Sequence, residues 1–216
     1  MATFKTMEEL LGAAPVMPIV TIAAADLAAD LARALVRGGI NAIEVTMRTP
    51  AALEAIEAIA REVPEITVGA GTVLTADDMR RAAGAGATFA ISPGTTPELL
   101  AAGREGILPY LPGVATAGEI QGGINAGYGC FKFFPAAGAA GIAALRAFAA
   151  PFPRLRFCAT GGITPETAQS YLDLPNVLSV GGSWIAPAEL IAKKDWNTIE
   201  ARARDAATSF RRKPSR

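Results

Sequence analysis

A lysine stands in the middle of an otherwise apolar segment, GCFKFFP, at residues 129–135. Side chains alternate between the two faces of a strand, so Lys132 would share one face with Phe134, while Phe131 and Phe133 would point the other way, toward helices. If Lys132 points into a barrel, burial favours its neutral amine, the nucleophile that forms a Schiff base with a carbonyl compound. The structural alternative is an interior lysine paired with a carboxylate, or a strand-end lysine that reaches water.

A second segment, AIEVTMRTP at residues 42–50, carries a polar face. Alternation places Glu44, Thr46 and Arg48 on that face, which we expect to point into the barrel because the opposite face is apolar. The chain has no histidine, so a general acid/base must be Glu, Asp, Lys, Tyr or a thiol, and Glu44 is the best placed. Arg48 suits bidentate capture of a substrate carboxylate. The alternative is an ion pair of Glu44 with Lys132 or Arg48 that fills the barrel, which is compatible with catalysis.

Two further segments contain small or turn-forming residues next to polar ones. In VGAGTV, residues 68–73, we expect Thr72 to point inward together with Ala70, and the glycines to leave room for a ligand or for tight packing. In ISPGTTPE, residues 91–98, Pro93 either lines a pocket or only forms a sharp turn.

Gly-Gly pairs end two of the later segments, ATGGIT at 159–164 and SVGGSW at 179–184. Glycines allow backbone N–H groups to turn toward an anion, and a following helix N-terminus adds a favourable dipole. Phosphate sites recur after the seventh and eighth strands of (β/α)₈ barrels. The pairs therefore predict a phosphate site, with ordinary turn chemistry as the alternative.

Eight short apolar segments recur along the chain at intervals of about 20 to 27 residues, which is the length of a βα unit. Each is followed by a helical pattern, and a dinucleotide-binding fingerprint does not follow the first segment, so we predict a closed barrel rather than an open doubly wound sheet. Thr-Pro pairs at 49–50, 96–97 and 164–165, and Thr75, are predicted helix N-caps. The expected strands are 16–22, 42–46, 67–71, 87–92, 107–111, 129–134, 156–160 and 177–181.

Composition bounds the architecture and the partners. The 216 residues are 51% hydrophobic, which is enough for a large core. Because the eight segments repeat and no linker separates them, we expect one α/β domain over residues 1–216: a single (β/α)₈ TIM barrel with an extra N-terminal helix and peripheral ends at 1–9 and 208–216. The formal net charge of zero argues against nucleic acid or an anionic membrane as a partner.

Cysteine usage and hydropathy bear on the compartment. The two cysteines, Cys130 and Cys158, have no metal-binding spacing and are too few for a secreted disulfide framework. We find no signal-peptide pattern and no segment long and apolar enough to cross a membrane. A cytoplasmic location is therefore expected.

The motifs taken together resemble the 2-keto-3-deoxy-6-phosphogluconate (KDPG) aldolase family, which includes 4-hydroxy-2-oxoglutarate (KHG) aldolases. The resemblance extends from about residue 10 to residue 205, and FKFFPA is its most specific part. It implies a trimeric class I aldolase on a (β/α)₈ barrel, which needs no metal or other cofactor and acts on a small keto-acid phosphate. The motifs that carry it are EVTMRT, GAGTV, ISPG, LPG, FKFFPA, TGGI and GGSW, in this order.

The resemblance also implies a role for individual residues. Lys132 would form the Schiff base, and Glu44 would be the general acid/base, partly through water. The other implied roles are carboxylate binding by Arg48 and Thr72 with Pro93 nearby, packing beside the Schiff base by Phe134, lining of the same wall by Thr160, and phosphate binding by Gly161, Gly162, Gly182 and Ser183.

The expected reaction is cleavage of KDPG to pyruvate and glyceraldehyde 3-phosphate, with a second activity that splits 4-hydroxy-2-oxoglutarate into pyruvate and glyoxylate. Alternative functions are an aldolase for the galactonate-derived epimer, and a non-catalytic phosphate-ligand barrel or trimeric scaffold. A metal-dependent phosphosugar epimerase or isomerase would need His or carboxylate clusters at strand ends, and the absence of histidine disfavours it.

Overall fold

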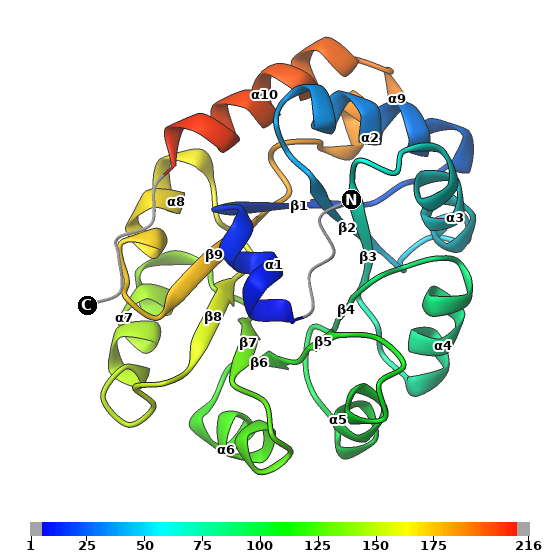
Figure 1. Ribbon diagram of the computed structural model, residues 1–216. Helices are drawn as coiled ribbons and strands as arrows, with labels where there is room; N and C mark the ends of the chain where they lie inside the picture. The colour runs from blue at the N-terminus through cyan, green and yellow to red at the C-terminus, as the bar shows by residue number, and fades with distance from the viewer. Residues whose placement is uncertain (1–5, 211–216) are drawn as a thin grey trace.

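Parallel strands alternate with helices along the chain, as the spacing of the apolar segments predicts. The computed structural model describes residues 6–210, and Figure 1 shows the helices arranged as a ring around the strands. The strands are β1 (Val16–Val20), β2 (Ala42–Thr46), β3 (Thr67–Gly71), β4 (Ala90–Ile91), β5 (Tyr110–Leu111), β6 (Gly113–Val114), β7 (Cys130–Phe133), β8 (Arg156–Ala159) and β9 (Val177–Gly182). The helices are α1 (Met7–Ala13), α2 (Ala28–Arg37), α3 (Ala52–Glu62), α4 (Ala76–Gly84), α5 (Pro97–Arg104), α6 (Ala117–Asn125), α7 (Gly138–Phe148), α8 (Pro165–Leu172), α9 (Ala188–Ala192) and α10 (Trp196–Ser209), with a 3-10 turn η1 (Ala25–Leu27).

The strands form one parallel sheet in the order β5-β4-β3-β2-β1-β9-β8-β7-β6. Its two edge strands, β5 and β6, are separated in the chain by Pro112 alone. Proline has no N–H to donate to a ladder, and the two halves pair with different neighbours, β5 with β4 and β6 with β7. The sheet is therefore a barrel whose fifth strand is divided at Pro112, and the predicted (β/α)₈ class is confirmed. The fifth strand spans 110–114, so the predicted range of 107–111 was wrong by about three residues.

The two faces of the strands pack as alternation predicts at Lys132. Phe131 and Phe133 face outward into the core under the helices. The ring of Phe133 meets that of Phe148 on α7 with centroids 6.1 Å apart, and Phe131 lies 6.3 Å from Phe157 on β8. These aromatic contacts fix the strand that carries Lys132 from its outer side.

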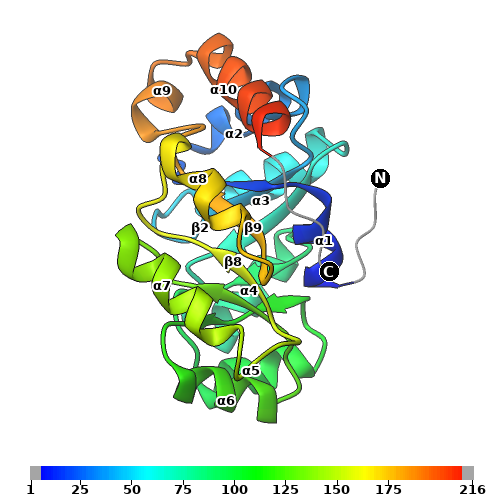
Figure 2. The ribbon, with the colours of Figure 1, turned by 90° about the vertical axis from the view of Figure 1, so that its left-hand side faces the viewer.

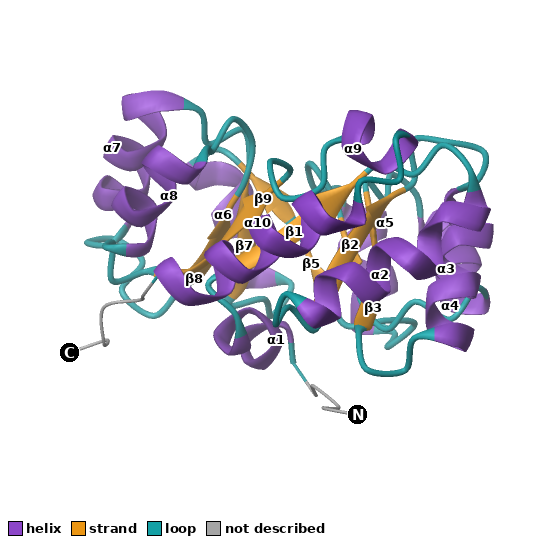
Figure 3. Ribbon diagram, turned by 90° about the horizontal axis from the view of Figure 1, so that it is seen from above, coloured by secondary structure: helices purple, strands orange, loops and turns teal. Residues whose placement is uncertain are grey.

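A separate apolar cluster fills the N-terminal end of the barrel. Helix α1 lies across that end (Figures 1 and 2) and contributes Met7, Leu10 and Leu11, which pack with strand residues that include Met17 and Phe89. Helix α9 lies at the opposite end, where the strands finish (Figure 3). The predicted N-terminal helix is thus confirmed, and it covers the N-terminal end of the barrel.

The predicted peripheral ends, 1–9 and 208–216, each include the end of a helix. Met7 is buried under the barrel and Thr6 caps α1. Helix α10 runs to Ser209, past the expected boundary at 208. Residues 1–5 and 211–216 lie outside the described part of the chain.

The helix N-caps follow the prediction with one exception. Thr75, Thr96 and Thr164 cap α4, α5 and α8. Thr49 does not cap α3, which begins at Ala52; its hydroxyl donates instead to the carbonyl of Ile22 at 2.6 Å. Within residues 6–210, no helix has the length and apolarity needed to cross a bilayer.

We expect Leu11→Ala to lower the free energy of unfolding by about 2 to 5 kcal/mol, because it leaves a cavity between α1 and the barrel. Leu11 is fully buried, whereas Leu74 is 58% exposed, so Leu74→Ala is a matched control that should change stability by less than about 0.5 kcal/mol. Urea unfolding curves measure both. Equal losses would show that α1 does not close the barrel.

Candidate active site

Lys132 and Glu44 meet inside the barrel. Lys132 lies on β7 and Glu44 on β2, and the lysine Nζ donates to the glutamate Oε1 at 3.3 Å. Their side chains are only 6% and 3% exposed. Desolvation of two charges is costly, and removing one partner of such a pair leaves an uncompensated buried charge, at about 3 to 5 kcal/mol. The contact therefore needs both residues, and it places a carboxylate within proton-transfer distance of an amine.

Gly71 on β3 provides the room that Glu44 occupies. A Cβ at this position would collide with the Glu44 carboxylate. Ala70, expected to face inward, packs instead in the outer core, and Gly71 takes the inward position. The glycines of GAG are a signal for close packing in the sequence, but they do not show which glycine meets which side chain.

Arg48 and Thr72 come together at the end of β2 and β3. Arg48 Nε donates to Thr72 Oγ1 at 3.0 Å. Thr72 has a φ of +57°, an uncommon value for a residue with a β-branched side chain. This left-handed turn ends the strand alternation and directs the Thr72 hydroxyl to the guanidinium. The pair therefore places a cation and a hydroxyl next to each other at the C-terminal ends of β2 and β3.

Pro93 follows β4, and Ser92 fixes the loop in which it lies. The Ser92 hydroxyl donates to the Gly94 carbonyl at 2.5 Å, accepts from the Gly113 N–H at 3.2 Å and shares a hydrogen bond with the Tyr110 hydroxyl at 2.6 Å. Ser92 is fully buried, and its bonds join the loop after β4 to both halves of the divided fifth strand. Sequence reasoning missed Ser92, because a serine in a turn motif carries no sign of buried partners.

Phe134 and Thr160 lie on the Lys132 side of the barrel. Lys132 Nζ is 5.4 Å from the centroid of the Phe134 ring. Thr160 is buried at the end of β8, and its hydroxyl is 3.7 Å from Cys158 Sγ, whose residue lies opposite Lys132 in the ladder. Both residues therefore lie on the same side of the barrel as Lys132, and their contact with substrate stays a prediction.

The two cysteines are free and do not have the character of nucleophiles. Burial raises the pKa of Cys158 to about 11, and the Glu44 charge adds to the effect. Burial also raises the pKa of Cys130. Both thiols stay protonated near neutral pH, where the thiolate is the reactive form.

The first Gly-Gly pair requires glycine at both positions. Gly161 and Gly162 have φ values of +100° and +71°, which side chains rarely adopt. A Cβ on Gly161 would also lie 2.9 Å from the Phe134 ring, and one on Gly162 would lie 2.8 Å from Ala137 Cβ. The loop after β8 is thus packed tightly against the segment that follows Lys132.

The second Gly-Gly pair ends the neighbouring strand. Gly182 is the last residue of β9, and a Cβ there would lie 2.9 Å from the Trp184 ring. Ser183 is exposed in the turn that follows. Since β8 and β9 are paired, both glycine loops leave the same end of the barrel side by side, as an anion site after the last two strands requires.

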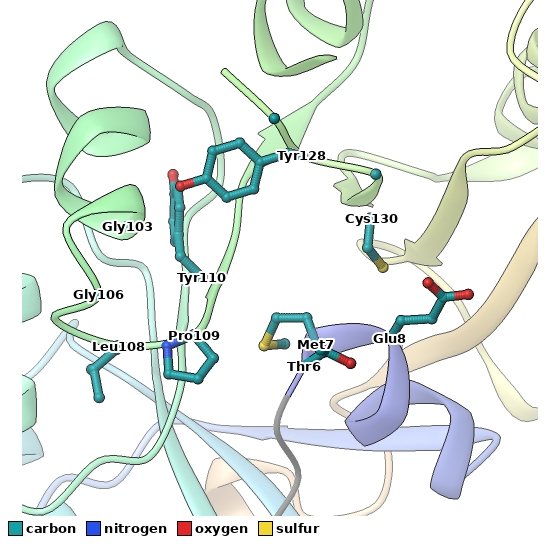
Figure 4. Close-up of a pocket in the computed structure, with 12 residues that line it drawn as sticks. Thr6, Met7, Glu8, Gly103, Gly106, Leu108, Pro109, Tyr110, Tyr128 and Cys130 are labelled. Atoms are coloured by element: carbon teal, nitrogen blue, oxygen red, sulfur yellow. The ribbon is translucent and has the colours of Figure 1, made fainter. Parts of the chain in front are cut away.

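A pocket of about 500 Å³ lies at the other end of the barrel (Figure 4). It is lined by the start of α1, including Met7 and Glu8, and by residues that precede or begin β5 and β7, including Tyr128. None of the predicted site residues lines it. In residues 6–210 we find no group of three or more His, Cys, Asp or Glu side chains arranged to hold a metal.

Comparison with known proteins agrees with the geometry. A family described as "Aldolase: KDPG and KHG aldolase" matches residues 7–202. The chain is 46% identical to a KHG/KDPG aldolase of Escherichia coli K12, over 95% of this chain and 97% of the relative.

Two solved structures are also similar. A KDPG aldolase of Legionella pneumophila, with pyruvate captured as a covalent carbinolamine, has a TM-score of 0.92 and 45% identity over 95% of this chain and all of the other. The Zymomonas mobilis ZM4 enzyme with 3-phosphoglycerate has a TM-score of 0.90 and 45% identity, over 95% of this chain and 96% of the other.

We expect Gly71→Ala to lower the free energy of unfolding by about 1 to 3 kcal/mol, because the new methyl group must displace the Glu44 carboxylate from its buried place. Gly84 ends α4, and beyond its chain neighbours and the backbone of its own helix nothing lies within 4 Å of the place that a methyl group would take there. Gly84→Ala is therefore a matched control that should be neutral or stabilising by up to about 1 kcal/mol. Urea unfolding curves of both variants measure these changes in the free energy of unfolding. If the two substitutions behave alike, Gly71 does not make room for Glu44.

Proposed function

This chain belongs to the KDPG and KHG aldolase family, and from that membership we infer that it is a class I aldolase that cleaves KDPG to pyruvate and glyceraldehyde 3-phosphate. The observation that carries the assignment to particular atoms is the buried contact of Lys132 Nζ with Glu44 Oε1 at 3.3 Å. It joins a nucleophile to a proton acceptor, and both side chains are almost fully buried.

The reaction begins with a proton transfer. Glu44 accepts a proton from the Lys132 ammonium, and the neutral amine attacks C2 of the keto acid. The resulting carbinolamine loses water, with protons supplied through Glu44, and becomes an iminium ion. The Legionella relative holds pyruvate as a carbinolamine, which is the corresponding intermediate on the product side.

Cleavage of the C3–C4 bond follows. Glu44, acting through a water molecule, takes the proton of the C4 hydroxyl, and the C3–C4 electron pair moves into the iminium to give an enamine. Glyceraldehyde 3-phosphate leaves as C4 becomes an aldehyde. Glu44 returns a proton to C3, and hydrolysis of the new iminium releases pyruvate and the free amine.

The proposed binding residues hold the two ends of the substrate. Arg48 and Thr72, whose side chains are 3.0 Å apart, take the carboxylate with Pro93 nearby. Phe134 packs beside the Schiff base, and Thr160 lines the same wall. Gly161, Gly162, Gly182 and Ser183 take the phosphate, and the positive φ of the first two supports a backbone anion site.

A second substrate is 4-hydroxy-2-oxoglutarate, as the name of the E. coli relative suggests. It carries no phosphate, so the glycine loops contribute little to its binding. We favour the gluconate-derived over the galactonate-derived substrate because the relatives described above are KDPG aldolases.

The proposed enzyme is a homotrimer that uses no metal or other cofactor, as the family resemblance implies. Its proposed location is the cytoplasm, which fits two cysteines that are both free thiols.

Incubation with pyruvate and borohydride should reduce the Schiff base and add the mass of one pyruvate-derived group to the peptide that holds Lys132. Peptide mass spectrometry locates the adduct. Lys132→Met should give none, because its thioether cannot form an imine. An adduct on another lysine, or no adduct on the native protein, would overturn the assignment.

Two controls separate the roles in this experiment. Glu44→Gln should still be trapped at Lys132, but more slowly than the native protein, and its turnover of KDPG should fall by about 10²- to 10⁴-fold, since it loses the group that moves protons. EDTA should leave the turnover of the native protein unchanged. A loss of activity with EDTA would favour a metal-dependent reaction instead.

A further inference from the structure

A hydrogen bond joins the turn that follows β9 to α10, the last described helix. Arg202, on α10, donates from Nη1 to the backbone carbonyl of Trp184 at 2.7 Å. Trp184 follows directly after Gly182 and Ser183, the proposed phosphate residues of this turn. A hydrogen bond from a charged donor is shorter and stronger than one between neutral groups, so the guanidinium restrains the peptide chain at this point.

The Trp184 side chain supports the same turn from within. Its ring lies against Gly182, where a Cβ would be 2.9 Å away, and it meets the Phe210 ring edge to face at 6.4 Å. Arg202 and Trp184 line one hollow of about 360 Å³ together with Asp205 and Phe210. Arg202 is exposed to solvent and lines this hollow beside the turn.

Helix α10, which carries Arg202, packs closely against α2. Its Ala203 lies so close to Gly38 at the end of α2 that a Cβ on Gly38 would collide with the Ala203 methyl, and would be 2.8 Å from the Glu200 carbonyl. An ion pair between Arg37 and Glu200, at 2.7 Å, joins the same two helices. A helix held this closely transmits its position to the turn through Arg202.

We propose that Arg202 is a positioning residue that holds the Gly182–Ser183 turn in the conformation that binds the substrate phosphate. Backbone anion sites act only when their N–H groups are held within a fraction of an ångström. Lys132 lies on β7, two strands away from β9 in the sheet, so the turn can loosen without moving the Lys132–Glu44 pair. This inference rests on the proposed function and adds a residue to it that directly touches neither substrate nor reacting atoms.

The test compares two substrates in one variant. Arg202→Ala should raise KM for KDPG about fivefold or more, with kcat within about twofold of the native value, because one charged hydrogen bond to the turn is lost. Both constants for 4-hydroxy-2-oxoglutarate, which has no phosphate, should stay within about twofold. Arg202→Lys keeps a charged donor and should recover part of the KDPG affinity.

Arg204→Ala is the matched control. It removes the same charge from the same helix, but Arg204 bonds to Glu200 at 2.6 Å and lies outside the hollow around Trp184. Neither substrate should respond to it. An equal loss on both substrates in Arg202→Ala, or no change on KDPG, would overturn the proposal.

A binding measurement separates this proposal from the proposed function. Inorganic phosphate can be titrated while tryptophan fluorescence is followed, since Trp184 lies in the turn, and Arg202→Ala should weaken phosphate binding by a similar factor. If the native protein cleaves neither substrate, the proposed function is wrong. Weaker phosphate binding by Arg202→Ala would still support the positioning role of Arg202. Unchanged phosphate binding would overturn that role.

Discussion

A lysine ammonium buried inside a barrel needs a counter-charge, and the rest of the site is arranged around the carboxylate that supplies it. Lys132 and Glu44 lie on β7 and β2, on different sides of the barrel, and meet only because the sheet closes. Glu44 in turn needs the space left by Gly71. In the proposed mechanism the same closeness that satisfies the two charges lets Glu44 deprotonate Lys132, so the interaction that makes the burial tolerable would also prepare the nucleophile.

The contact between Lys132 and Glu44 therefore depends on closure of the barrel, and the barrel closes where its fifth strand is irregular. The fifth strand is divided at Pro112, whose carbonyl still accepts the N–H of Lys132 at 2.9 Å. The buried Ser92 hydroxyl forms hydrogen bonds with both halves of that strand and so joins them to the loop that contains Pro93. Side-chain hydrogen bonds thus take over where the ladder is interrupted, next to the strand that carries the lysine.

The regular part of this arrangement could be predicted from the sequence, because strand alternation is local. It placed Lys132 and Glu44 inside, and Phe131 and Phe133 outside. The prediction for Ala70 was wrong because it counted back from Thr72, which lies beyond β3 in the left-handed region; within β3 the inward positions are held by glycines, which have no side chain to mark them. Contacts such as those of Ser92 and Arg202 join segments far apart in the chain, and no local pattern marks them.

In the proposed complex, Lys132 carries the substrate carbon while Arg48 and Thr72 hold its carboxylate. A crystal structure of the protein soaked with pyruvate tests this most directly. We expect continuous density from Lys132 Nζ to C2 of pyruvate, with the carboxylate oxygens within hydrogen-bond distance of Arg48 and Thr72. Pyruvate bound without a covalent link, attached to another lysine, or turned with its carboxylate away from Arg48 would contradict it.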